Sequence, residues 1–133
     1  MKRHYVDIDG YWGIIFIYDY NFMDIDELAA ILDSFGASEK DIRKAMPILY
    51  SVNSGMTISC SDLTMSVVVI SEATNVEQFM DTITHEIDHV QDAIDRHYGV
   101  RQGSEDSAWL QGYIMRGISR ALKEDGIVCE FNK

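Results

Sequence analysis

The feature that most constrains the fold is a segment in which apolar residues recur every three or four positions. These residues are Val76, Phe79, Met80, Ile83, Ile87, Val90 and Ile94. Because one helical turn takes 3.6 residues, this spacing places them all on one face of an amphipathic helix. Thr74 or Asn75 can cap its start, Glu77 or Gln78 can complete a capping box, and Gly99 can end it. We therefore predict one long helix that packs its apolar face against a core.

A second helix is predicted after the polar loop at residues 101–103. Ser104 is a suitable N-cap, and Glu105 and Asp106 follow in the first turn. Basic residues lie near the other end, before Gly126, so the charges complement the helix macrodipole. A short loop between two long helices favours antiparallel packing.

Strands are predicted in the first half of the chain. Residues 11–18 are nearly all apolar or aromatic, which is typical of a buried strand. Residues 55–60 alternate polar and apolar side chains, residues 66–70 are rich in valine, and a turn at 62–64 separates them. We interpret residues 56–70 as a β-hairpin.

Two shorter helices are predicted between the first strand and the hairpin. One runs from an acidic cap at Asp24 to Gly36, and the other begins at Ser38 and ends near Pro47, the only proline. The resulting order of elements predicts an α+β fold: a small sheet packed on a long helix and a C-terminal helix. With 133 residues, the chain is expected to form one domain, residues 1–133.

Composition narrows the classes of partner and location. A formal net charge of −11 repels a phosphate backbone, so we expect no nucleic-acid partner. No stretch approaches the roughly 18 apolar residues of a membrane span, and the N-terminus does not resemble a signal peptide. We expect no membrane partner and a cytoplasmic location. Cys60 and Cys129 are expected to be reduced thiols rather than a disulfide.

His85, Glu86 and His89 carry the clearest chemical signal. The two histidines are four residues apart on the predicted helix, so both imidazoles leave the same face, about one 5.4 Å turn apart. Two nitrogens placed in this way can reach one tetrahedral Zn²⁺ ion. Glu86 is rotated by about 100° from His85, where a general base can flank an open coordination position. The segment predicts a zinc site with two histidine ligands and a glutamate base.

A catalytic zinc site needs a third protein ligand. Asp95 and His97 lie further along the same helix, with Asp95 about 9 Å beyond His89 along the axis. Glu105 is preferred, because the loop before it allows the next helix to pack antiparallel and present a carboxylate. Asp106 is the remaining alternative, and both acidic residues are also explained by their place at a helix N-terminus.

Two segments of the chain resemble the gluzincin group of zinc metallopeptidases. Residues 84–90 read THEIDHV and residues 104–113 read SEDSAWLQGY. In that group, one helix supplies two histidine ligands and the base, and a second helix supplies a glutamate ligand followed by a small residue and a glycine. Glu105, Ala108 and Gly112 match the second pattern. The chain is most similar to the small predicted peptidase domains of phage and bacterial genomes.

This resemblance covers residues 66–117 and implies a zincin-like fold with its metal-binding part at residues 66–123. It implies hydrolysis of a peptide or protein substrate, with residues 66–70 as the edge strand along which the peptide lies. The implied zinc ligands are His85, His89 and Glu105, and the implied base is Glu86. The alternative is a binding module that retains the metal site but does not catalyse. The pattern leaves substrate specificity and oligomeric state open.

Overall fold

The computed structural model describes residues 1–128. Its elements, in chain order, are β1 (Lys2–Ile8), β2 (Trp12–Tyr20), a 3₁₀ turn (Phe22–Asp24), α1 (Ile25–Phe35), α2 (Glu39–Ala45), a second 3₁₀ turn (Ile48–Tyr50), β3 (Gly55–Cys60), β4 (Met65–Ser71), α3 (Val76–Tyr98) and α4 (Glu105–Glu124). The predicted α+β class is confirmed. Cys60 is a free, partly buried thiol, whereas Cys129 lies outside the described residues.

The four strands form one mixed sheet in the order β1-β2-β4-β3. The two inner strands, β2 and β4, run parallel, with Ile15 opposite Val67 and Phe16 opposite Val68. Each outer strand is antiparallel to its inner neighbour. Because parallel neighbours need a crossover, the chain passes through α1, α2 and β3 between β2 and β4.

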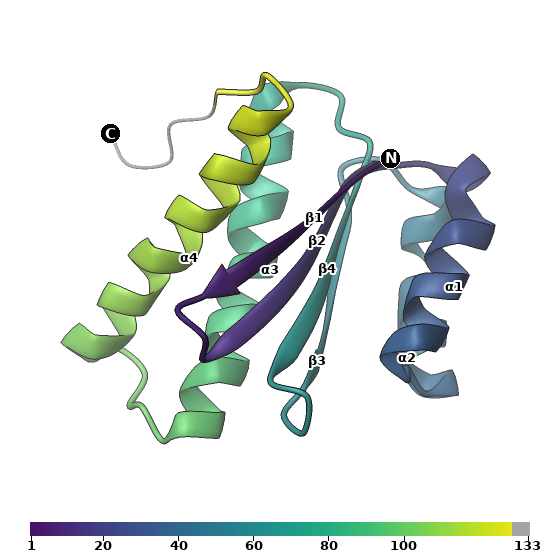
Figure 1. Cartoon of the computed structure of the whole chain (residues 1–133). Coiled ribbons are helices and arrows are strands. Elements are labelled where there is room, and N and C mark those ends of the chain that lie inside the picture. Colours follow the sequence, from purple (N-terminus) through teal and green to yellow (C-terminus); the bar gives the residue numbers. More distant parts are fainter. Residues whose placement is uncertain (129–133) are drawn as a thin grey trace.

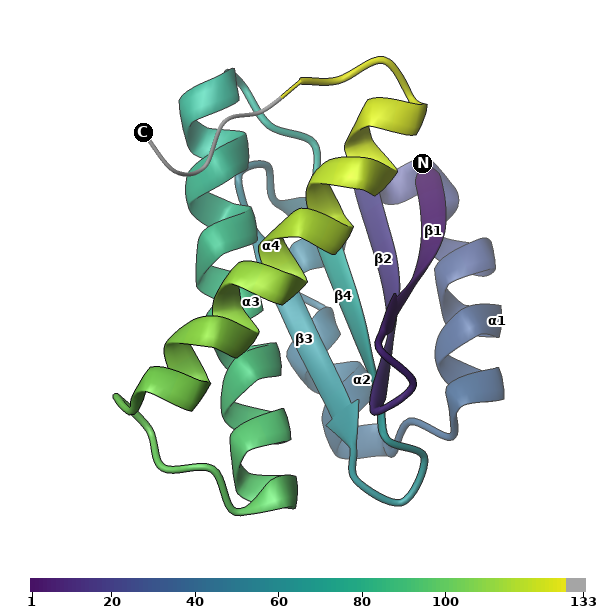
Figure 2. The same cartoon turned by 60° about the vertical axis from the view of Figure 1, so that its left-hand side comes forward.

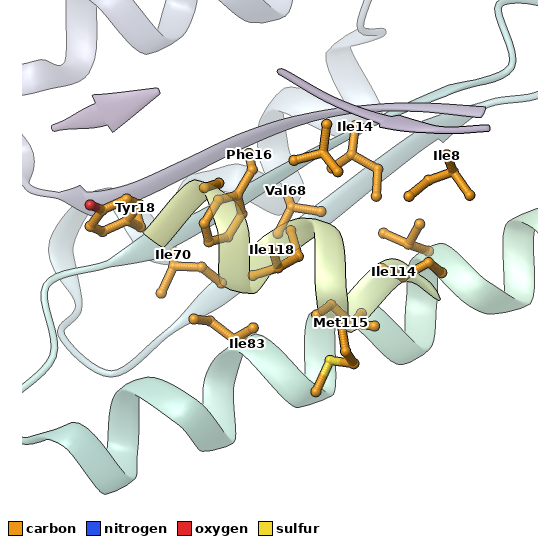
Figure 3. Packing of buried hydrophobic residues seen from close by; sticks show 14 of the residues in the cluster. Ile8, Ile14, Phe16, Tyr18, Val68, Ile70, Ile83, Ile114, Met115 and Ile118 are labelled. Atoms are coloured by element: carbon orange, nitrogen blue, oxygen red, sulfur yellow. The ribbon is translucent and has the colours of Figure 1, made fainter. Parts of the chain in front are cut away.

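Helices cover both faces of the sheet, α3 and α4 on one side and α1 and α2 on the other (Figures 1 and 2). Successive side chains of the inner strands point to opposite faces of the sheet, so β2 and β4 contribute apolar residues to the core on each side. On the α3/α4 side, strand residues such as Phe16 and Val68 meet Ile83 and Ile118 (Figure 3). On the other side, Ile17, Val67 and Val69 join the second cluster, which includes α1 residues Leu28, Ile31 and Leu32.

The helix boundaries agree with the capping signals. The Asn75 side chain accepts a hydrogen bond from the Gln78 amide at the start of α3, and Gly99 ends the helix with φ of 69°. At the start of α4, the Ser104 side chain accepts from the Ser107 amide. The predictions of a long helix, a polar loop and a C-terminal helix are confirmed.

Two sequence-based expectations about the sheet are corrected. Strand β1 was not predicted, because most of its residues are charged or polar and only Val6 and Ile8 are buried. Residues 66–70 were expected to form an edge strand, but they belong to β4, which has a hydrogen-bonded neighbour on each side. The edge strand of this hairpin is β3 instead.

Asp125 fastens the end of α4 to β1 and β2. Its Oδ2 accepts a hydrogen bond from the Tyr18 hydroxyl at 2.5 Å and lies 2.6 Å from Nε2 of His4. The bond from Tyr18, followed by that with His4, lowers the pKa of Asp125, whereas burial and then the same carboxylate raise the pKa of Tyr18. Because the pKa of Asp125 is lower in the folded state, its ionised carboxylate stabilises the fold at any pH above the pKa of the unfolded state. This contribution is lost as the pH falls through the pKa of the folded state.

Two glycines on α4 give a matched test of the packing. A Cβ atom at Gly117 would lie 2.6 Å from Cγ1 of Val6, whereas a Cβ at Gly112 would meet nothing within 4 Å. Gly117→Ala is expected to lower the free energy of unfolding by about 1–3 kcal/mol through overpacking against β1. Gly112→Ala is expected to raise it by about 0.5–1 kcal/mol through helix propensity. Urea unfolding of both variants checks this, and equal shifts would contradict the close α4–β1 contact.

Candidate functional site

The buried stripe of α3 determines where the predicted site residues point. Ile83, Ile87 and Val90 are buried against the sheet. His85 and His89 therefore leave the helix on its outer side, where both are exposed. Their ring centroids are 5.0 Å apart, with an angle of 88° between the planes. The structure thus brings the two imidazoles together, as the sequence spacing predicts.

Glu86 points from α3 toward edge strand β3 and is only 4% exposed. The Thr57 hydroxyl donates a hydrogen bond of 2.9 Å to its Oε1 and also lies 3.2 Å from its backbone oxygen. This contact holds the carboxylate on the side of α3 that faces β3. A buried carboxylate with a single, oriented hydroxyl partner retains acceptor capacity for a proton or a water.

Gly55 explains how β3 comes so close to α3. A Cβ atom at this position would lie 2.7 Å from Cγ of Glu86 and 2.9 Å from Cγ2 of Thr82. A side chain on residue 55 would therefore displace Glu86. Sequence reasoning missed both Gly55 and Thr57 as site residues, because the alternation in this segment indicates a strand and carries no sign of which helix covers it.

A hollow of about 590 Å³ lies along this junction of β3 and α3. Its lining includes three residues before or at the start of β3 and seven on α3: Asn53, Ser54, Gly55, Gln78, Asp81, Thr82, Thr84, His85, Glu86 and Asp88. The lining is polar and contains three carboxylates but no lysine or arginine. A peptide or another polar molecule fits this composition better than an apolar ligand.

Hydrogen bonds hold the wall of the hollow that precedes β3. Asn53 Oδ1 accepts from the Thr74 amide at 2.9 Å, and the Asn53 amide donates to the Glu72 oxygen. Ser54 and Ser71 exchange two further bonds of 2.9 Å between side chain and backbone. The segment before β3 is therefore tied to the segment that leads into α3, so both walls of the hollow are fixed relative to each other.

The structure does not bring Glu105 to the histidine pair. Helices α3 and α4 are antiparallel, and the Gln111 side chain donates a hydrogen bond of 3.2 Å to Asp88. Gln111 therefore marks the position on α4 that lies opposite the histidine pair of α3. Glu105 lies six residues before Gln111, about 9 Å along the helix axis, and its side chain is exposed. Within residues 1–128, no three His, Cys, Asp or Glu side chains are grouped to hold a metal. Glu105 as a ligand stays a prediction from the resemblance, one that this packing does not support.

The other candidate ligands also lie apart from the pair. Asp95 is 2% exposed and accepts a hydrogen bond of 2.7 Å from Ser107, so it fastens α3 to α4. Its Oδ1 has no hydrogen-bond partner. His97 packs edge-on against Trp12 at a centroid distance of 5.6 Å. Asp106 lies in the first turn of α4, next to Glu105. Asp95 and His97 are separated from His89 by an unbroken stretch of α3, and Asp106 lies on α4.

Comparisons with protein-family models, with curated proteins and with solved structures find no match for this chain. Within residues 1–128, none of the helices combines the length and apolar character that a bilayer crossing requires.

Zinc binding is expected to depend on both histidines. His85→Ala and His89→Ala should each abolish stoichiometric zinc binding, because a single remaining imidazole is not enough to hold the ion. Competition with a chromophoric chelator measures this effect. Full zinc occupancy in both single variants would exclude the pair as the metal site.

Glu105 can be tested against its neighbour on the same helical turn. Given its exposure and distance, Glu105→Ala is expected to leave zinc affinity within about threefold of wild type, as is Asp106→Ala. The same chelator competition applies. A loss in Glu105→Ala as large as in the histidine variants, with none in Asp106→Ala, would show that the first turn of α4 moves to the pair when metal binds.

Proposed function

We propose that this chain is a zinc-dependent hydrolase of peptide bonds, with a zincin-like site formed by His85, Glu86 and His89. The observation that carries the proposal is the position of Glu86. Its side chain is buried, is oriented by Thr57 of the edge strand, and lines the polar hollow together with His85. A glutamate whose only role was solubility would lie in solvent, because burying a carboxylate against β3 costs free energy.

Each residue has a defined task in this proposal. His85 and His89 would hold the ion from one face of α3. Zinc would supply Lewis acidity and a water of lowered pKa. Glu86 accepts a proton from the attacking water at its carboxylate and later passes it to the leaving amine. Thr57 keeps the carboxylate oriented through the transfer.

Edge strand β3 is the proposed place for the substrate backbone. β3 pairs with β4 on one side only, so its outer edge offers backbone donors and acceptors to an extended peptide. This role was expected of residues 66–70 and moves to Gly55–Cys60. Because Gly55 and Thr57 contact Glu86, a peptide along this edge would pass close to the base.

A second candidate is a binding module that keeps the metal but does not catalyse. The observation in its favour is the ligand count, because the described residues bring two imidazoles together and no third metal-ligating side chain. Catalytic zinc sites usually have three protein ligands. The two candidates differ in what they require of Glu86, which is essential for hydrolysis and dispensable for simple metal binding.

Glu86→Gln separates the two candidates. Glutamine is nearly isosteric and can still accept a hydrogen bond from Thr57, but it cannot take up a proton at neutral pH. The variant is expected to bind zinc normally and to lose about 10²–10⁴-fold in peptide hydrolysis. Zinc content and cleavage of a peptide library, read by mass spectrometry, are measured side by side with wild type.

Glu77→Gln is the matched control, because Glu77 is an exposed glutamate on the same helix outside the hollow. It should retain wild-type zinc binding and cleavage. Equal cleavage by wild type and Glu86→Gln would exclude Glu86 as the base. A wild type that binds zinc but cleaves no peptide in the library would favour the binding module.

A further inference from the structure

A second cavity lies where the β1–β2 turn meets the C-terminal end of α3 and the start of α4. It has a volume of about 470 Å³ and is lined mainly by apolar and aromatic side chains. Tyr11, Tyr98, Trp109 and Tyr113 contribute four aromatic rings. Tyr98 lies nine residues after His89, about 13 Å along the axis of α3, so this cavity is separate from the histidine site.

Three of these rings are unusually accessible. Trp109 is 68% exposed, Tyr11 61% and Tyr98 44%, whereas the other tryptophan of the chain, Trp12, is 1% exposed. The tyrosines are held in place, because the Tyr98 hydroxyl donates to the Tyr11 backbone oxygen and the rings meet edge-to-face at 5.9 Å. Large rings that are fixed and exposed around a cavity indicate a recognition surface.

The charge of the cavity determines which ligand it suits. Asp9, in the β1–β2 turn, and Asp106, in the first turn of α4, add two carboxylates to the lining, which contains no lysine or arginine. The guanidinium of Arg116 lies over the Tyr113 ring, 5.1 Å from its centroid. The rings that remain available to a ligand are those of Tyr11, Tyr98 and Trp109. Aromatic faces flanked by carboxylates attract a cation that also has an apolar part.

We propose that this cavity binds an arginine side chain of a partner polypeptide. The guanidinium stacks on the Trp109 ring and pairs with Asp9 or Asp106, and the methylene groups contact Ile94 and Leu110. Arginine is favoured over lysine because its planar group stacks on aromatic rings and is less strongly hydrated than an ammonium. This proposal does not rest on the proposed hydrolytic function, since the cavity shares no lining residue with the hollow that contains His85 and Glu86.

The two tryptophans make this proposal measurable by NMR. The indole of Trp12 is buried and donates to Ser66 at 2.9 Å, so its N–H signal serves as an internal reference, whereas Trp109 reports on the cavity. We expect acetyl-Gly-Arg-Gly-amide to shift the Trp109 indole signal in a saturable manner and to leave Trp12 unchanged. The same peptide with citrulline, a neutral isostere, should produce at most a small shift.

Single substitutions locate the binding. Because Trp109 is exposed, Trp109→Ala should retain the fold, and affinity measured by calorimetry should fall by roughly 2- to 30-fold. Asp9→Asn and Asp106→Asn should each weaken binding and its dependence on salt. Asparagine tolerates the φ of 51° at position 9. Tyr50→Ala, at an exposed ring that does not line the cavity, is the control and should leave affinity unchanged.

Three results would overturn the proposal. One is a citrulline peptide that binds as tightly as the arginine peptide, which would remove the role of charge. Another is a lysine peptide that binds equally well, which would remove the preference for arginine. The third is an unchanged Trp109 signal with millimolar arginine peptide, which would show that the cavity does not take this side chain.

Discussion

The parallel pairing of β2 with β4 is the interaction on which the rest of the molecule depends. Both strands are buried on both faces, and β4 has no exposed residue along its length. Such strands are stable only if helices cover each side of the sheet. The two cores follow from this requirement, with α3 and α4 on one face and α1 and α2 on the other (Figure 2). The antiparallel outer strands then complete the sheet.

The position of α3 over β3 and β4 links this architecture to the candidate site. Its apolar stripe is fixed by the sheet, so the angles of all other α3 side chains are fixed as well. Glu86 turns toward β3, where Gly55 leaves room for it and Thr57 binds it. His85 and His89 turn outward. The orientation of α3 that buries its apolar stripe therefore also buries the Glu86 carboxylate and leaves the two imidazoles exposed.

The sequence was most informative where local signals determine the structure. The cap at Asn75, the glycine at 99 and the 3.6-residue spacing predicted α3, and with it the juxtaposition of His85 and His89. These features depend on residues close together in the chain. The valine-rich hairpin was predicted on the same basis.

Features that depend on tertiary packing could not be predicted in the same way. β1 presents few apolar residues because α4 covers only part of it, around Val6 and Ile8. The order of strands, and hence which strand is the edge, depends on pairing between distant segments. The level of Glu105 relative to His89 is determined by where α3 ends and how α4 returns. No local pattern contains that information.

The C-terminal half of α4 and the residue that follows it contact β1 and β2, through Val6 with Gly117 and Tyr18 with Asp125, and so join segments more than 100 residues apart. During synthesis, the strands that carry Ile14, Phe16 and Val68 leave the ribosome well before the helix that shields them. One face of the nascent sheet therefore stays exposed to solvent until α4 has been synthesised. Native burial of this face becomes complete only after the last turns of α4 have emerged.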